Sequence, residues 1–436
     1  MAGVGVGGSG IGRRRRSGST GGQRQKQAMK DGLIYDWNKV DIGAKPPTVM
    51  LDDETLRDGL QSPSVRTPTI DQKIRILHLI DALGIDTADI GLPGAGPHVA
   101  RDVERLAREI GSAGLRVKAN CAARTHVNDI APIADIVHRT GVPIECCTFI
   151  GSSPIRQYTE GWTLDWLLRN TEEAITFAVK EGLEVMHVTE DTTRANPDTL
   201  RAIYRCAIHA GARRVCIADT VGHATPTGAA AVVKFVAQVI ADSGAVVGID
   251  WHGHRDRDLA ITNSIAALEA GASRIHGAAL GMGERVGNTP MDLLLVNLVL
   301  MGYMKRDVRK LGEYCQAVSE ACGVPIPDNY PVLGRDAFRT ATGVHAAAVV
   351  KAWKKGDTEL MDAVYSAIPA SMVGREQVID VGPMSGKSNV IYWLEKRGIA
   401  PADALVERIF RKAKASSAVL TEEEILAEVY ELRTKN

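Results

Sequence analysis

Two histidines, His252 and His254, have a spacing that suits metal binding. Strand side chains alternate with a period of two, so histidines at i and i+2 of an extended segment project from one face. The apolar run at residues 245–250 precedes them and predicts a buried strand that ends at the imidazoles. Imidazole suits Zn, Mn, Fe or Co, so the pair makes half a metal site. Such a pair alone is more often an ordinary strand end, and its place among other strand ends therefore decides the matter.

The rest of a metal site must come from elsewhere in the chain. A divalent cation needs a carboxylate or a third nitrogen beside two histidines, with open positions for substrate and water. We predict Asp58 as the carboxylate and Asn288 as a weak oxygen ligand. Such a site would chelate a 2-oxo acid through its ketone and carboxylate oxygens. Arg57 would supply a cation for charge on an oxygen, although a surface ion pair with Asp58, worth roughly 0–1 kcal/mol, is the alternative. Glu190 is a candidate acid-base group.

Eight units of a short strand and a longer helix are predicted between residues 46 and 305. The β-prone runs lie at residues 48–51, 87–92, 115–122, 143–150, 183–190, 213–220, 245–252 and 274–281. Eight strands alternating with helices predict a (β/α)8 TIM barrel, an α/β fold. Polar residues at the carboxyl ends of its strands converge on one face, where barrel enzymes keep their chemistry. His252 and His254 end the seventh of these strands.

Composition and charge exclude several classes of protein. The chain of 436 residues is 45% hydrophobic and 24% charged, as in an ordinary globular protein. A formal net charge of zero points to neither nucleic acid nor an anionic membrane as a partner. No apolar run approaches the roughly 20 residues that span a bilayer. Seven cysteines without framework spacing favour free thiols in a reducing compartment, so we expect a cytoplasmic protein.

The N-terminal segment, residues 1–40, differs from the rest in composition. Its first 30 residues are rich in Gly, Ser, Arg and Lys, with four consecutive arginines at residues 13–16. Such a segment buries too little apolar surface to offset its chain entropy, so we expect a disordered basic arm. A solvated tail is favoured over a polyanion-binding arm, because the rest of the chain shows no basic stripe.

Five motifs follow one another at the predicted strand ends. They are LDDETLRDGLQ (51–61), VTEDTTR (188–194), ADTVGHATP (218–226), HGH (252–254) and GMGERVGN (281–288). Together they resemble the DRE-TIM metallolyase superfamily, specifically its acetyl-CoA-condensing branch of 2-isopropylmalate, homocitrate and citramalate synthases. The related lyase branch carries a catalytic cysteine in the loop after the eighth strand. This chain has no cysteine between Cys216 and Cys315, so the synthase branch is favoured.

The resemblance implies a Claisen-type condensation. Acetyl-CoA loses a methyl proton, its enolate adds to the ketone of a metal-bound 2-oxo acid, and water hydrolyses the thioester. The implied metal is Mn, Mg, Zn or Co, and its implied ligands are Asp58, His252, His254 and Asn288. Arg57 matches the arginine that steadies the enolate or alkoxide oxygen, and Glu190 the catalytic glutamate. Thr220 matches the threonine that holds the carboxylate of the 2-oxo acid.

The identity of the 2-oxo acid stays open at this point. TFIGSSPI at the fourth strand (148–155) resembles the isopropylmalate branch, which implies a leucine-biosynthetic enzyme. Arg124 would instead pair with the distal carboxylate of 2-oxoglutarate, as a homocitrate synthase requires. Gln61 and Thr148 are further candidates for substrate contacts. Citramalate synthase and a specialised-metabolism homologue are the next alternatives, and a non-catalytic barrel acting as a scaffold is the alternative from another class.

Residues 306–436 are predicted to form mainly helical subdomains that complete the active site. Residues 342–352 resemble the synthase helix whose histidine reaches the partner subunit's site, which makes His345 a candidate acid-base residue. Tyr365 is a second trans-acting candidate, so the resemblance implies a domain-swapped homodimer. Without the resemblance, a solvent-facing helix histidine is an equal alternative for His345. Two departures matter: no leucine-regulatory domain is expected, and residues 255–258 read RDRD where these synthases usually show Asn-Asp.

Overall fold

A computed structural model of the chain describes residues 1, 3, 33–34, 38 and 49–434. The chain divides into two compact units, Met1–Lys45 and Pro46–Asn436, and nearly all of the predicted basic arm lies outside the described residues. None of the helices in the described ranges combines the length and apolar character needed to cross a bilayer. All seven cysteines are free thiols.

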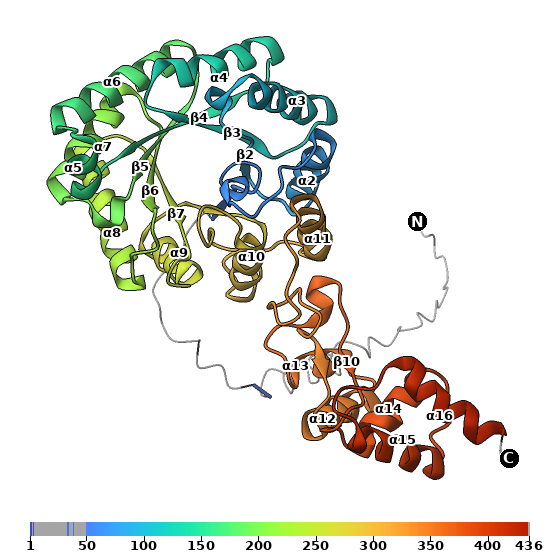
Figure 1. The fold of residues 1–436 in the computed structure, drawn as a ribbon. Coiled ribbons are helices and arrows are strands. Elements are labelled where there is room, and N and C mark those ends of the chain that lie inside the picture. The colour runs from blue at the N-terminus through green and yellow to red at the C-terminus, as the bar shows by residue number, and fades with distance from the viewer. Residues whose placement is uncertain (2, 4–32, 35–37, 39–48, 435–436) are drawn as a thin grey trace. The chain divides into compact units, whose positions relative to one another are not determined.

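The second unit begins with a closed barrel of eight parallel strands (Figure 1). The strands are β1 (Met50–Asp53), β2 (Thr87–Asp89), β3 (Lys118–Arg124), β4 (Ile144–Gly151), β5 (Val185–Glu190), β6 (Arg214–Asp219), β7 (Gly248–Gly253) and β8 (Arg274–Gly277). Sequential strands pair in parallel, and β8 closes the barrel by pairing with β1 from Met50↔Arg274 to Asp53↔Gly277. The predicted (β/α)8 barrel is confirmed.

Helices alternate with the strands and surround the barrel in Figure 1. They are α2 (Ile70–Ala82), α3 (Pro97–Ala113), α4 (Val127–Thr140), α5 (Pro154–Glu160), α6 (Leu164–Lys180), α7 (Pro197–Ala210), α8 (Pro226–Ser243), α9 (Ala260–Ala270) and α10 (Met291–Leu300). Local sequence sets their ends: the Thr69 side chain and Gln72 form a capping box at the start of α2. Two predicted strands are shorter than expected, because the backbone turns into 3-10 helices at Pro93–Ala95 and Ala279–Gly281.

Alternation along the strands separates an outer and an inner set of side chains. Trp251 on β7 is fully buried in the hydrophobic core outside the barrel, so its neighbours Asp250 and His252 face the interior. The lower interior is ionic: Asp250 pairs with Arg214 and with Arg274 (2.5 Å), and Arg274 also pairs with Glu145 (2.6 Å). This network closes the floor beneath the strand ends.

Mainly helical structure follows the barrel, as predicted. Helix α11 (Leu311–Cys322) packs against α2, and its buried residues belong to the same hydrophobic cluster as the barrel core. A two-stranded sheet joins β9 (Arg339–Thr340) and β10 (Val378–Ile379). The remaining helices are α12 (Gly343–Lys354), α13 (Thr358–Ala363), α14 (Lys387–Lys396), α15 (Asp403–Ala415) and α16 (Glu422–Thr434), and they enclose two smaller hydrophobic clusters.

Candidate active site

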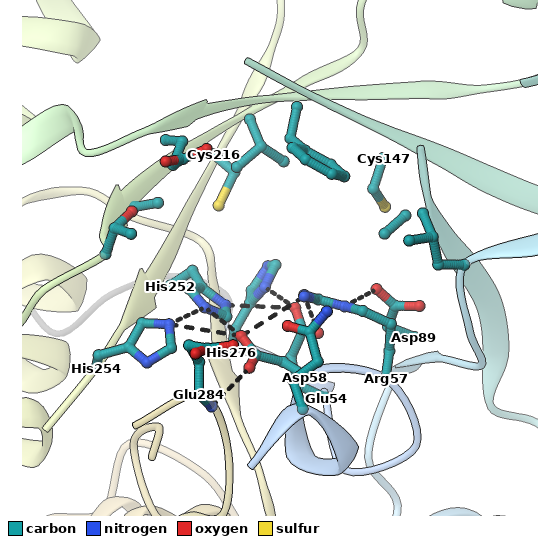
Figure 2. A pocket seen from close by; sticks show the side chains of 18 of the residues that line it. Glu54, Arg57, Asp58, Asp89, Cys147, Cys216, His252, His254, His276 and Glu284 are labelled. Atoms are coloured by element: carbon teal, nitrogen blue, oxygen red, sulfur yellow. Dashed lines mark hydrogen bonds and ion pairs between the residues drawn. The ribbon is translucent and has the colours of Figure 1, made fainter. Parts of the chain in front are cut away.

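A cavity of about 410 Å³ opens at the carboxyl ends of the barrel strands. This volume lies within the range of small-molecule sites, roughly 300–1,000 Å³. Its lining includes seven of the twelve predicted site residues, namely Arg57, Asp58, Gln61, Glu190, Thr220, His252 and His254. Figure 2 shows the charged and imidazole groups on one side of the cavity and the Cys147 and Cys216 sulfurs on the other.

Three side chains converge with the spacing of metal ligands (Figure 2). The Nε2 atoms of His252 and His254 lie 3.2 Å apart. Asp58 Oδ2 lies 3.3 Å from the first and 3.5 Å from the second. Ligand atoms bound at about 2.1 Å to one ion are separated by about 3.0–3.4 Å in octahedral or tetrahedral geometry. The three atoms therefore fit a single divalent cation between them.

Asn288 offers a fourth donor. Its side-chain Nδ2 donates to the Met282 carbonyl (3.0 Å), and its buried Oδ1 has no hydrogen-bond partner within the described residues. An isolated β-bridge pairs Asn288 with His254, which brings the amide next to the histidine pair. The loop requires a glycine at Gly287, where an added Cβ would lie 1.7 Å from the Gly281 carbonyl oxygen. An unsatisfied buried oxygen beside two imidazoles and a carboxylate fits a metal ligand.

Glu54 supports this group from behind. Its Oε1 lies 3.4 Å from His252 Nδ1 and 2.9 Å from His276 Nδ1, and its Oε2 pairs with Arg57. A carboxylate on the far nitrogen of a ligating histidine fixes the ring's tautomer and orientation. His254 has no such support, because its buried Nδ1 lacks a partner among the described side chains. Glu54 therefore orients one of the two imidazoles.

Glu54, His252 and His276 could in principle hold a second ion. His276 is already placed between Glu54 Oε1 and Asp250 Oδ2, at 2.9 Å from each. Burial lowers the pKa of His276, but Asp52, Asp250 and Glu54 outweigh it and raise that pKa to about 10. Both ring nitrogens of His276 are thus already engaged by carboxylates. We therefore assign this second group to an ion-pair network.

Glu54→Gln is expected to weaken divalent metal binding by about 10–100-fold. The substitution replaces the carboxylate that orients His252 through its Nδ1 with a neutral amide. Calorimetric titration with Mn²⁺ measures the change directly. Glu145→Gln is the matched control, since it removes another inward-facing carboxylate of the barrel without touching His252. Equal metal affinities for Glu54→Gln and the unaltered protein would refute the supporting role.

Arg57 lies within a group of three carboxylates. Its Nε donates to Asp89 (2.9 Å), its Nη2 donates to Glu54, and its Nη1 lies 3.5 Å from Asp58. Burial lowers the pKa of the guanidinium, but the three carboxylates raise it well above its ordinary value. A guanidinium has five N–H groups, so N–H groups remain for a ligand oxygen after these contacts. Arg57 is thus a fixed cation beside the predicted metal ligands.

Glu190 lies where the cavity meets a second one of about 450 Å³, which is lined in part by Trp162 and Trp166. Its carboxylate pairs with Arg156 Nε at 3.0 Å, and its side chain is 30% exposed. Burial raises the pKa of Glu190, Arg156 opposes this rise, and Asp191 adds to it. A partly buried carboxyl with a raised pKa at a cavity edge suits proton transfer.

Arg156→Ala is expected to shift the acid limb of the pH–kcat/KM profile to higher pH. The Arg156 cation favours the ionised form of Glu190, so its removal raises the carboxyl pKa further. If Glu190 acts as the base, activity needs the ionised form and the limb moves with that pKa. Arg156→Lys keeps the charge and should leave the limb nearly in place. An unmoved limb in Arg156→Ala would exclude Glu190 as the titrating group.

Thr220 and Gln61 also line the cavity. Thr220 follows β6, and its Oγ1 accepts a hydrogen bond from the Asp191 backbone N–H (2.8 Å). Arg285 Nη2 donates to the backbone carbonyl of Thr220. Nε and Nη2 of Arg285 also donate to the two carboxylate oxygens of Asp256. Asp256 belongs to the RDRD segment, which differs from the usual Asn-Asp. The contact that this difference provides is therefore the one between Asp256 and Arg285.

Two predicted substrate contacts are not brought into this cavity. Thr148 points out of the barrel, because its neighbours Cys147 and Phe149 are the inward residues of β4, and its Oγ1 bonds His187 Nδ1 (3.0 Å). Arg124 is bound through two nitrogens to Asp129 and lines the second cavity instead. We therefore leave both residues out of the proposal below.

His345 and Tyr365 lie together on the helical region after the barrel. Their rings stack with centroids 4.3 Å apart, and both side chains are exposed. Neither residue lines the barrel cavity of its own chain within the described structure.

The sequence analysis missed several lining residues: Glu54 as a supporting group, Asp89, His276, Cys147, Met186 and Cys216. Alternation could have identified His276, since it lies two residues beyond the inward Arg274 on β8. Asp89 has a carboxyl pKa that burial raises to about 8, partly opposed by Arg57. The apolar residues carried no separate signal, because a cysteine or methionine in a strand is more often core.

Comparisons with known proteins agree with this geometry. The HMGL-like family model matches residues 48–318. A homocitrate synthase of Methanopyrus kandleri is 33% identical over 85% of this chain and 88% of its own length. A probable 2-isopropylmalate synthase of the same organism is 31% identical over 85% of this chain and 70% of its own. An HMG-CoA lyase structure from Bacillus subtilis superposes with a TM-score of 0.55 at 19% identity, covering 65% of this chain and 97% of the lyase, which supports the fold alone.

Proposed function

The chain belongs to the HMGL-like family, and on that basis we propose that it condenses acetyl-CoA with a 2-oxo acid and hydrolyses the thioester, as a 2-isopropylmalate synthase does. The observation that carries the proposal is the convergence of Asp58, His252 and His254 beside Arg57 at the mouth of the barrel. Such an enzyme is an acyltransferase of cytoplasmic leucine biosynthesis.

The proposed metal ligands are Asp58, His252, His254 and Asn288. A divalent cation such as Mn, Mg, Zn or Co, when bound there, supplies Lewis acidity to the ketone of the 2-oxo acid. The ligand atoms present fit that role, because an unsatisfied amide oxygen accompanies two imidazoles and a carboxylate.

The chain's own groups then divide the remaining work. Arg57, fixed by carboxylates on three sides, stabilises negative charge on the reacting oxygen. Glu190 transfers a proton at its carboxylate, and its contact with Arg156 adjusts the pKa. The Thr220 side chain, at the end of β6, is proposed to bind the carboxylate of the 2-oxo acid, with Gln61 on the same cavity wall.

One assay tests the proposal. Purified protein with Mn²⁺ and acetyl-CoA is given 3-methyl-2-oxobutanoate, 2-oxoglutarate, pyruvate or oxaloacetate in parallel, and released CoA thiol is measured. We expect release that requires both the cation and a 2-oxo acid, and that is fastest with 3-methyl-2-oxobutanoate. No release with any of the four acids would overturn the proposed function.

Homocitrate synthase is the second candidate, since relatives with that name match 85% or more of this chain. That reaction needs a cation for the distal carboxylate of 2-oxoglutarate. Arg124 is the residue expected to provide it, and it is bound to Asp129 and lies in the neighbouring cavity. The geometry therefore favours a 2-oxo acid without a second carboxylate.

His345 and Tyr365 are proposed to act in the site of a second copy, as a domain-swapped homodimer requires. Mixing inactive His345→Ala protein with inactive Arg57→Ala protein should then restore up to about a quarter of the activity, because subunit exchange creates sites that carry neither substitution. Turnover of the mixture is the measurement. Absence of any recovery, after co-purification through different affinity tags on the two variants has shown mixed dimers, would exclude shared sites.

A further inference from the structure

The wall of the cavity formed by β4, β5 and β6 is apolar. Three inward-facing residues, one from each strand, form a small hydrophobic cluster: Cys147 on β4, Met186 on β5 and Cys216 on β6. Val188 packs against this cluster. The strand register places Cys147 beside Met186 and Val188 beside Cys216. Figure 2 shows the Cys147 and Cys216 sulfurs turned into the cavity. The three side chains thus form a continuous inner wall.

Apart from Glu190, which ends β5, the charged groups of the lining come from the other strands and the loops that follow them. In a closed ring of eight, strands four apart face each other, so β4 faces β8 and β5 faces β1. The lining side chains that come from these far strands and from the turn after β1 are Glu54, Arg57, Asp58, Asp89 and His276. A 2-oxo acid whose ketone lay near Asp58 and His252 would have the sulfur-lined wall open to its side chain.

Among the described residues, the lining that comes from β4, β5 and β6 contains no arginine, lysine or histidine that could bind a second carboxylate. The two arginines elsewhere in the lining already pair with carboxylates, Arg57 with Asp89 and Glu54, and Arg285 with Asp256. The two thiols add no charge, because burial raises the pKa of both Cys147 and Cys216 well above the ordinary value. A carboxylate placed against this wall would lose its water without gaining a partner.

We propose that Cys147, Met186 and Cys216 form the subsite for the side chain of the 2-oxo acid, that they restrict it to an apolar chain, and that they set its length. The proposal rests on the proposed function and makes it narrower: dicarboxylic 2-oxo acids are excluded although homocitrate synthases are among the nearest relatives. The size of these three side chains should set the longest substrate chain that fits, because the two cysteines are small and leave space beside the wall.

A chain-length series tests the subsite. The Mn²⁺-loaded protein is assayed with pyruvate, 2-oxobutanoate and 2-oxopentanoate, and with 2-oxoglutarate, in which a carboxylate replaces the terminal methyl group of the last of these. Burial of each methylene should raise kcat/KM about fourfold. The carboxylate should lower it at least tenfold relative to 2-oxopentanoate. A flat series, or a preference for 2-oxoglutarate, overturns the proposal.

Substitutions at Cys147 should move the length preference in both directions. Cys147→Leu narrows the chamber and is expected to lower kcat/KM for 2-oxopentanoate at least tenfold more than for pyruvate. Cys147→Ala widens it and should extend acceptance to 2-oxohexanoate. Cys146→Ala is the matched control, because Cys146 is the adjacent residue and belongs to the hydrophobic core outside the barrel. An identical length profile in all three variants overturns the assignment.

Binding separates this proposal from the proposed function. Calorimetric Kd values for the same acids on the Mn²⁺-loaded protein, without acetyl-CoA, should follow the same order as kcat/KM. If no acid releases CoA, the proposed function fails, and the Kd series still decides the subsite. If CoA is released and 2-oxoglutarate binds most tightly, the function stands and the subsite assignment is wrong. Failure of every acid to bind overturns both.

Discussion

His252→Ala is expected to abolish turnover and metal binding while leaving the fold intact. His252 Nε2 lies within 3.3 Å of two of the three other predicted ligand atoms, Asp58 Oδ2 and His254 Nε2, so its removal leaves no compact set. Losing the Lewis acid should lower kcat by at least about 10³-fold, which corresponds to about 4 kcal/mol. Turnover and metal content measured on the same preparation test this.

A matched substitution shows that the effect is local. His138→Ala removes an exposed histidine from the last turn of α4 that does not belong to the cavity lining, and it should keep full activity and metal content. Circular dichroism and Tm of both variants report on the fold. Stoichiometric Mn²⁺ in folded His252→Ala protein would contradict the ligand assignment, and retained activity would contradict the mechanism.

Arg57→Lys is expected to lower kcat by about 10²–10³-fold with metal affinity kept within a few-fold. Lysine preserves the charge, but its compact ammonium cannot place donors where Nε and Nη2 of the guanidinium meet Asp89 and Glu54 and still reach a substrate oxygen. The loss should fall on kcat more than on KM, because charge on the oxygen develops only as the reaction proceeds. Steady-state kinetics with 3-methyl-2-oxobutanoate measures this division.

The control for Arg57→Lys is Arg139→Lys, which changes an exposed arginine that pairs with Glu104 on the barrel exterior. Its kinetics should match those of the unaltered protein. The Tm of Arg57→Lys is measured as well, because an arginine among buried carboxylates also contributes to stability. The loss of kcat is assigned to catalysis only if this Tm stays near that of the unaltered protein. If Arg57→Lys retains its kcat, a point charge suffices and the proposed need for a guanidinium at this position is wrong.

The sequence contained much of the fold because the signals involved are local. Each strand and helix is defined by the periodicity of its own residues, and eight such units leave few arrangements other than a barrel. The same periodicity placed His252 and His254 on one face of one strand. Strand ends were less certain: β2 and β8 stop early because the backbone turns at Pro93 and near Ala279.

The inward or outward direction of a side chain depends on tertiary context. Thr148 was predicted as a substrate contact, yet the residues of β4 that line the cavity are Cys147 and Phe149. A shift of one residue exchanges the two faces of a strand, and only packing against the barrel core fixes which face is inside. Arg124 likewise carried a plausible charge for a second carboxylate until Asp129, five residues away, was found to bind it.

The order of the elements, the motifs and the paired histidines could be read from neighbours along the chain, and Asp58 could be predicted as their partner. Folding alone brings Asp58 Oδ2 to 3.3 Å and 3.5 Å from histidines nearly two hundred residues later. It also supplied Glu54 and His276 behind them and the sulfur-lined wall opposite. The physical reason is closure of the barrel, which brings β1 beside β8 and sets β4 to β6 across from them, a relation that no local pattern encodes.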